Sequence, residues 1–180
     1  IEQYYSSSDL EKLWSTYNIE KCTVTNVPSS QKSGYKLEAE LDTQYMSSMG
    51  EKIPMTVWYT QGTFENALME WTTNVLNATS PPLLFSVSYG STEQTYGGSY
   101  ISRLNTNLAA MGTRGITVMF ASGDSGAGGG CTTGPFQPDY PASSPYVTAV
   151  GGVTGGTEGK EPLGESVWID GGGGFSNYAP

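Results

Sequence analysis

Short, continuous runs of apolar residues alternate along the chain with segments of helical spacing, and this alternation constrains the fold more than any other feature. The runs cover residues 83–87, 115–121 and 146–150. Runs of this length suit strands that are buried on both sides in a parallel sheet. Residues 64–76 and 99–111, which precede the first two runs, have the spacing of helices. Strands that alternate with helices imply crossover connections, so the sequence predicts an α/β protein with a parallel sheet covered by helices on both faces.

The remaining expected elements are short. They are a helix over residues 10–17, a strand and loop within 23–34, a helix over 35–49, a strand over 55–59 and a hairpin within 151–174. The polar run Ser6-Ser7-Ser8-Asp9 is expected to cap the first of these helices, and Gly50 to close the second.

The balance of charge excludes several kinds of partner. The chain has 8 basic and 17 acidic side chains, and its isoelectric point is about 4.3. Nucleic acids and anionic membranes are bound by clustered Lys and Arg, so neither is an expected partner. No apolar run approaches the ~18 residues that span a bilayer. With 180 residues the chain is one domain or a piece of one, and because it begins with neither Met nor a signal peptide, we expect it to be cut from a longer protein.

The chain contains no histidine, which removes the usual base of neutral-pH catalysis and a common zinc ligand. Its two cysteines, Cys22 and Cys131, could pair with each other, pair with cysteines outside the chain or remain free thiols. Asn77-Ala78-Thr79 is a sequon, so Asn77 is a glycan acceptor if the chain passes through the secretory route.

Acidic residues on the helix predicted over residues 35–49 form the first candidate site. On a helical wheel Leu41, Tyr45 and Met49 define an apolar arc that should face the protein. Glu38 and Asp42 fall within this arc, one turn apart. The opposite arc, which should face solvent, holds Lys36, Glu40, Thr43, Gln44 and Ser47. Glu40 is therefore predicted to be an ordinary surface acid.

Two carboxylates that point inward together have a distinct chemistry. Burial of one carboxylate costs several kcal/mol unless it is hydrogen-bonded or neutralised, and a like charge beside it raises that cost. A shared proton relieves the cost, and such a pair can then act as a base under acidic conditions. The alternative is a half-exposed acidic edge of the helix, solvated or paired with a lysine.

Asp124 is the second candidate. It follows a predicted strand in Ala121-Ser122-Gly123-Asp124-Ser125-Gly126, and ligands of open α/β sheets bind at such strand ends. A carboxylic acid held protonated in a dry pocket can donate a hydrogen bond to a developing oxyanion. The alternative is an Asx turn. A chymotrypsin-like nucleophile at Ser125 is excluded, since that chemistry needs a histidine base, and no Gly-Lys-Ser/Thr motif supports a phosphate-binding loop.

Six stretches of the chain, taken in order, resemble the sedolisin family of serine-carboxyl peptidases, and within it a lysosomal branch that removes tripeptides. They are Glu38-Ala39-Glu40-Leu41-Asp42, Val87-Ser88-Tyr89-Gly90, Tyr100-Ile101-Ser102-Arg103-Leu104-Asn105-Thr106, Phe120-Ala121-Ser122-Gly123-Asp124-Ser125-Gly126-Ala127-Gly128, Pro141-Ala142-Ser143-Ser144-Pro145-Tyr146-Val147-Thr148-Ala149-Val150-Gly151-Gly152 and Gly172-Gly173-Gly174-Phe175-Ser176-Asn177. The resemblance covers nearly the whole chain and implies a subtilisin-like fold.

The resemblance also implies roles for residues. Glu38 would be the general base, Asp42 its orienting partner and Asp124 the oxyanion donor. Ser88, Tyr89 and Gly90 would pair with the backbone of a peptide or protein substrate. Cys131 matches a family cysteine whose partner lies further along the chain, which implies a disulfide to a cysteine outside residues 1–180. The implied location is lysosomal or secreted.

Two features of the family are expected to lie beyond Pro180: the nucleophilic serine segment and the calcium loop. Residues 1–180 would then be the amino-terminal part of a catalytic domain, inactive alone, and its partner would be the carboxyl-terminal fragment of the same peptidase. Calcium would be the implied cofactor, bound outside this chain, which itself has no expected metal site. The alternative function is a non-catalytic binding or structural protein that reuses the scaffold.

Overall fold

The computed structural model describes residues 3–28, 36–128, 136–155 and 166–178. These residues fall into two compact units, Ile1–Trp71 and Thr72–Pro180. The boundary lies within helix α3 (Phe64–Asn77).

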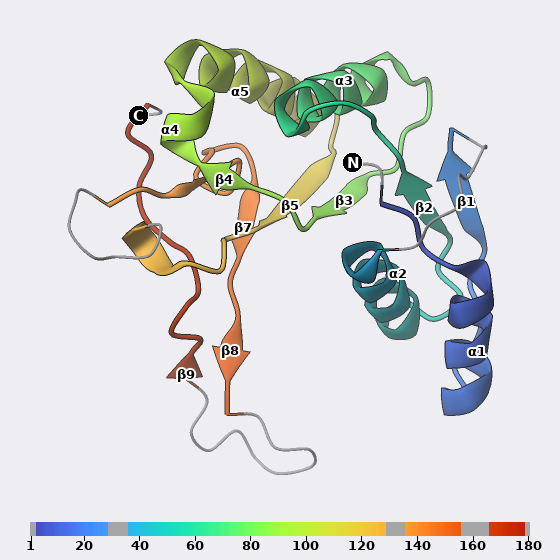
Figure 1. Cartoon of the computed structure of the whole chain (residues 1–180). Helices are drawn as coiled ribbons and strands as arrows, with labels where there is room; N and C mark the ends of the chain where they lie inside the picture. The colour runs from blue at the N-terminus through green and yellow to red at the C-terminus, as the bar shows by residue number, and fades with distance from the viewer. Residues whose placement is uncertain (1–2, 29–35, 129–135, 156–165, 179–180) are drawn as a thin grey trace. The chain divides into compact units, whose positions relative to one another are not determined.

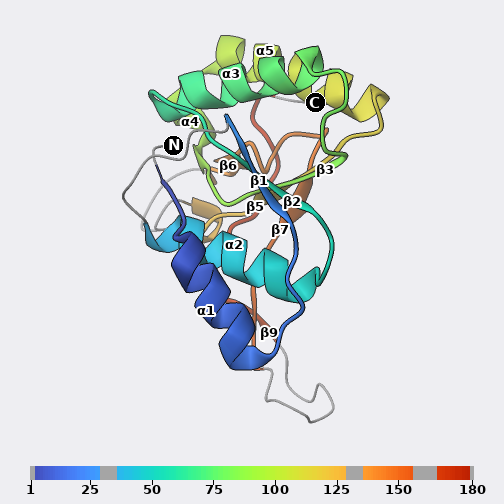
Figure 2. The ribbon, with the colours of Figure 1, turned by 90° about the vertical axis from the view of Figure 1, so that its right-hand side faces the viewer.

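The first unit combines two helices with a pair of parallel strands. Its elements are α1 (Ser7–Tyr17), β1 (Val24–Val27), α2 (Leu37–Met49), β2 (Met55–Trp58) and the beginning of α3. Val24 of β1 pairs with Met55 of β2, and α1 lies beside α2 (Figure 2).

Local signals in the sequence account for the limits of α1 and α2. Ser6 caps α1, and its hydroxyl accepts a hydrogen bond from the Asp9 amide. Asn18 ends α1 in the left-handed conformation, with φ of 54°, which asparagine tolerates better than most residues. Gly50 ends α2, as predicted, and its amide bonds to the Met46 carbonyl.

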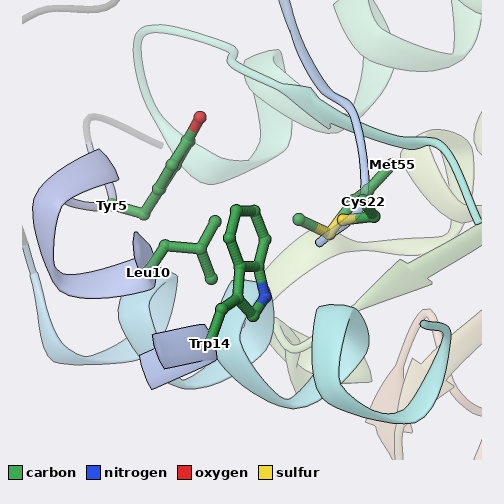
Figure 3. Close-up of a cluster of buried hydrophobic side chains, with 5 residues drawn as sticks. All are labelled: Tyr5, Leu10, Trp14, Cys22 and Met55. Atoms are coloured by element: carbon green, nitrogen blue, oxygen red, sulfur yellow. The ribbon is translucent and has the colours of Figure 1, made fainter. Parts of the chain in front are cut away.

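A small apolar core holds α1 to β2 in this unit. Trp14 occupies the centre of the cluster, with Leu10 on one side and Cys22 and Met55 on the other (Figure 3). Tyr5 completes the set. Cys22 is a buried free thiol, and burial raises the pKa of this thiol. In this structure Cys22 is thus a core residue and not a disulfide partner.

The second unit is built on a three-stranded parallel sheet with the order β3-β5-β7. Its strands are β3 (Leu84–Val87), β5 (Thr117–Ala121) and β7 (Thr148–Val150). Helix α5 (Gly98–Thr113) packs on β5 (Figure 1). The parallel α/β prediction is therefore confirmed.

Burial of these strands differs from the prediction. In β5 the side chains of Val118 and Phe120 are buried, but Leu84 of β3 and all three residues of β7 are exposed. β3 and β7 are the outer strands of this sheet, and Leu84 pairs with the exposed Thr117 on one face. The expectation that each apolar run is buried on both sides is wrong for these two strands, because side chains are covered by what packs on the faces of the sheet, and α5 packs on the central strand β5.

Short elements complete the second unit. They are β4 (Ser91–Thr92), α4 (Glu93–Tyr96), a 3-10 turn (Gly126–Gly128), β6 (Asp139–Tyr140), β8 (Val153–Thr154) and β9 (Ser166–Val167). β8 and β9 form the hairpin predicted in the glycine-rich segment. β4 pairs with β6 in antiparallel orientation, an arrangement that the sequence did not predict.

A fully buried carboxylate, Glu93, joins three segments of this unit. Its backbone amide donates to the Pro138 carbonyl at 3.1 Å. Its side-chain oxygens accept hydrogen bonds from the Ser143 hydroxyl and the Asn177 amide, each at 2.8 Å. Glu93 therefore fixes the segment near Asn177 to α4 and to the loop after β6.

Arg114 joins α5 to the end of α3. Its guanidinium donates hydrogen bonds to the carbonyls of Val75, Leu76 and Ala78. Val75 and Leu76 lie in the last turn of α3 and Ala78 follows it, so Arg114 supplies donors to carbonyls at this end of the helix.

Candidate active site

Helix α2 carries Glu38 and Asp42 one turn apart, and both side chains are half-buried. The predicted adjacency of the two carboxylates therefore follows from the helix itself. Both residues belong to the first unit, whereas Asp124 and the segment Ser88–Gly90 belong to the second.

The orientation predicted for α2 is wrong. Its buried side chains are Glu40, Thr43 and Ser47, three residues that the helical wheel assigned to solvent. The side chains of its apolar arc are exposed instead, with fractions of 48% for Leu41, 68% for Tyr45 and 86% for Met49. The polarity of its residues gave the wrong buried face for α2, because the polar face receives hydrogen bonds from the Ser6 amide and the Trp14 indole.

Glu40 is thus not a surface acid. Its exposed fraction is 9%, and one carboxylate oxygen accepts a hydrogen bond from the Ser6 amide at 2.5 Å. The other oxygen accepts from the Gln44 side-chain amide at 3.0 Å. Two accepted hydrogen bonds compensate the burial of this charge.

Asp124 lies just beyond the carboxyl end of β5, as predicted, in a turn that backbone hydrogen bonds hold on both sides. The Gly126 amide donates to the Asp170 carbonyl at 2.8 Å, and the Gly172 amide donates to the Gly123 carbonyl at 2.9 Å. The side chain of Asp124 is exposed in the described part of the chain. Its role as an oxyanion donor stays a prediction.

Asp139 is a second carboxyl group at this turn, and the sequence did not predict it. A Cβ atom placed on Gly123 would lie 1.9 Å from Asp139 Oδ2, so the carboxylate rests against the backbone of the turn. Gly123 has φ of 103°, a conformation that favours glycine. Burial raises the pKa of Asp139, and the nearby charge of Asp124 raises it further. Asp139 therefore keeps its proton to a higher pH than an ordinary aspartic acid does.

The predicted substrate segment, Ser88–Gly90, contacts β6, the strand that contains Asp139. Ser88 and Tyr89 are half-buried after the end of β3, and Gly90 is exposed. A Cβ atom on Gly90 would lie 3.1 Å from the Tyr140 carbonyl oxygen. Strand β6 therefore contacts the Asp124 turn through Asp139 and the Ser88–Gly90 segment through Tyr140. No periodic pattern marks a strand of two residues, so the sequence carried no signal that indicated β6.

The remaining predictions concern the sequon, Cys131, metal binding and membrane spans. Asn77 is the last residue of α3 and is exposed, as is Thr79, so the sequon is accessible. Cys131 lies outside the described residues. Within the described ranges, no three His, Cys, Asp or Glu side chains lie close enough to hold a metal ion, and no helix there has the length and apolarity needed to cross a membrane.

Comparison of the sequence with known proteins gives matches along its whole length. No family model matches the chain. It is 39% identical over 191 residues to tripeptidyl-peptidase 1 of Macaca fascicularis and of Homo sapiens, and 38% identical to that of Bos taurus. In each case the match covers 100% of this chain and 33% of the relative. The chain thus spans about a third of the length of the curated relatives it matches.

Comparison of the structure with solved structures identifies the fold. A sedolisin from Pseudomonas, a serine-carboxyl proteinase complexed with two molecules of pseudo-iodotyrostatin, superposes with a TM-score of 0.78. The match covers 95% of this chain and 54% of that chain at 22% sequence identity, which establishes the fold. The parallel sheet and its acid-bearing segments therefore define part of a serine-carboxyl peptidase domain. The chain is a homologue of tripeptidyl-peptidase 1 over about a third of that protein's length, and it has the fold of sedolisin.

Proposed function

We propose that the protein containing this chain is an acid-acting serine peptidase that cleaves peptide bonds in the manner of a tripeptidyl-peptidase. The observation that carries this proposal is the 39% identity to tripeptidyl-peptidase 1 along the whole chain. That length includes α2, which holds Glu38 and Asp42 one turn apart, and the Asp124 turn after β5.

Glu38 would act as the base. It would take the proton of a serine hydroxyl as that oxygen attacks the scissile carbonyl, and would then return the proton to the leaving amine. Asp42 would share the proton and orient Glu38, because two adjacent half-buried carboxylates are more stable with one proton between them. The serine itself would lie on a polypeptide segment outside residues 1–180.

Asp124 would donate a hydrogen bond to the oxyanion that forms on the attacked carbonyl. This role requires that the carboxyl group of Asp124 carry a proton that it can donate. The carboxyl group of Asp139 adjoins the same turn, against the backbone at Gly123. Ser88, Tyr89 and Gly90 would pair with the substrate backbone beside this turn.

The setting of this chemistry is part of the proposal. An acidic optimum fits a lysosomal or secreted protein, and the exposed sequon at Asn77 fits passage through the secretory route. The carboxyl-terminal remainder of the same peptidase would be the partner of this chain, and Cys131 would form its disulfide to that remainder. Any calcium would be bound by residues outside this chain, and no proton transfer described above depends on it.

The test is peptide hydrolysis by the full-length protein between pH 3 and 8. We expect activity with an acidic optimum, and a loss of about 100-fold or more in kcat for Glu38→Gln, because general-base catalysis is worth roughly 10²–10⁴ in rate. Glu51→Gln, which removes an exposed acid from the same unit, serves as the control. Release of tripeptides from peptides with a free amino terminus, and not from acetylated ones, would establish exopeptidase action.

Two results would contradict the proposal. Full activity of Glu38→Gln would remove Glu38 as the base. A full-length protein that binds peptides at every pH but never cleaves them would instead support the non-catalytic alternative. Intact-mass analysis under reducing and non-reducing conditions would show whether a second polypeptide is joined to this one.

A further inference from the structure

Glu40 is the acid on α2 for which the proposed chemistry has no use. It lies between Glu38 and Asp42 in the chain, two residues from each. Because successive helical residues are rotated by about 100°, its side chain leaves the helix roughly 200° away from both. Glu40 therefore faces the interior of the first unit, and the other two carboxylates face away from it.

The hydrogen bonds of Glu40 fasten α2 to the start of α1. Its carboxylate accepts from the Ser6 amide at 2.5 Å, and Ser6 is the N-cap of α1. Its second oxygen accepts from Gln44 within α2, which holds the carboxylate in one orientation. The contact therefore joins a backbone amide at the start of α1 to a carboxylate whose orientation is held by Gln44.

A second hydrogen bond joins the same two helices further along. The indole nitrogen of Trp14 donates to the Ser47 hydroxyl at 3.1 Å, and both residues are buried. Glu40 and Ser47 are seven residues apart, or about two helical turns. Two fixed contacts on one face of a helix restrict its rotation about its own axis, which one contact would not.

We propose that Glu40 is a positioning residue, which sets the rotation of α2 and thereby the directions in which Glu38 and Asp42 point. This role rests on the proposed function, but the contact itself does not. Glu40 touches neither substrate nor reacting atoms in this scheme. A hydrogen-bonded interface suits the task because hydrogen bonds are directional, whereas apolar packing tolerates a helix that rotates.

The experiment compares Glu40→Ala with Glu40→Gln in the full-length protein. Alanine removes the contact to Ser6. Glutamine keeps one oxygen that accepts from the Ser6 amide, but it loses the charge and puts an NH₂ group opposite the Gln44 side chain, whose amide can turn to present its oxygen. We expect kcat of Glu40→Ala to fall roughly tenfold to hundredfold at similar KM, the effect of a misplacement of about 1 Å. Glu40→Gln should stay within about threefold of the parent, by the same estimate. Ser47→Ala should shift kcat in the same direction as Glu40→Ala.

Hydrogen exchange gives a readout that needs no activity. In Glu40→Ala the Ser6 amide should exchange faster, and in Glu40→Gln it should remain protected. The Leu10 amide, which donates to the Ser6 carbonyl at 3.1 Å within α1, is an internal control that should remain protected in both variants. Glu51→Ala controls for the loss of one negative charge in the same unit.

Three outcomes would overturn the proposal. In the first, Glu40→Ala keeps the kcat of the parent although the Ser6 amide exchanges faster. In the second, Glu40→Ala loses kcat although the Ser6 amide exchanges as slowly as in the parent. Glu40→Gln could be as inactive as Glu40→Ala, which would indicate that the charge itself takes part in the reaction. Should Glu38→Gln prove fully active, the proposed peptidase mechanism fails, while exchange at Ser6 still decides whether Glu40 fastens α2.

Discussion

Two carboxyl groups meet at the turn after β5, and the sequence indicated only one of them. Asp124 follows an apolar run and so marks a strand end, whereas Asp139 belongs to a strand of two residues with no periodic signal. The contact between Asp139 and Gly123 is a tertiary one, since 16 positions separate the two residues. Neither composition nor spacing along the chain encodes such a contact.

Asp139 makes stability depend on pH in a defined direction. Its pKa is raised above the ordinary value of 3.8, so the folded state binds this proton more tightly than the unfolded state does. The stabilisation is present below the unfolded pKa and is lost as the pH rises through the folded one. We therefore expect Asp139→Asn to melt at a higher temperature than the parent at pH 7, with a difference that diminishes toward pH 3.

Thermal unfolding at several pH values measures this effect. Asp170→Asn controls for the loss of one negative charge in the same unit, because that side chain is exposed. A gain in Tm that is equally large at pH 3 and pH 7 would show that packing, and not proton binding, distinguishes Asp139→Asn.

At the scale of elements, buried carboxylates act as joints between segments that are distant in sequence. Glu93 links α4 to residues 143 and 177 through hydrogen bonds of 2.8 Å. A buried acceptor that loses its partners costs more than an exposed one, because water does not replace the lost hydrogen bonds.

Substitution of Glu93 tests this joint. In Glu93→Gln an amide NH₂ replaces one of the two accepting oxygens, so either Ser143 or Asn177 loses its acceptor. We expect a loss of about 1–3 kcal/mol in the free energy of unfolding, measured by urea titration. Glu70→Gln, the same substitution at an exposed position of α3, should change it by less than about 0.5 kcal/mol. Equal effects of the two substitutions would contradict a role for the buried contacts.

Helices and the longer strands were largely predictable from the sequence, because periodic apolar residues and caps mark them. The helix predicted over 99–111 is α5 (Gly98–Thr113), and the strand predicted over 55–59 is β2 (Met55–Trp58). The face that α2 buries was not predictable. Its polar side meets the Ser6 amide and the Trp14 indole, and such donors become visible only once α1 is folded beside it.

At the scale of the whole molecule, the family was recognisable from the sequence because its motifs follow one another in order across both units. The individual roles of Glu38, Asp42 and Asp124 were predicted from that resemblance and remain predictions. Position alone gave useful support, since α2 brings two of these carboxylates together and the third follows a parallel strand, where α/β proteins place their sites.

Glycosylation at Asn77 is predicted if the protein is secreted or lysosomal. The sequon at Asn77 is exposed at the end of α3, so we expect a glycan there when the protein is expressed through the secretory route. Endoglycosidase treatment should lower the mass of the parent, and Asn77→Gln should abolish that part of the shift. Asn74→Gln, an exposed asparagine one turn earlier without a sequon, should leave it unchanged. A parent protein without a glycan on Asn77 would refute the assignment.

The sulfhydryl enclosed with Trp14 in the first unit has a practical consequence. Alkylating reagents attack thiolates that they can reach, and Cys22 is both covered by its neighbours and shifted toward its neutral form. Labelling at this position must therefore wait for local opening of the first unit. The labelling rate of Cys22 would therefore report the opening of the unit that carries Glu38 and Asp42.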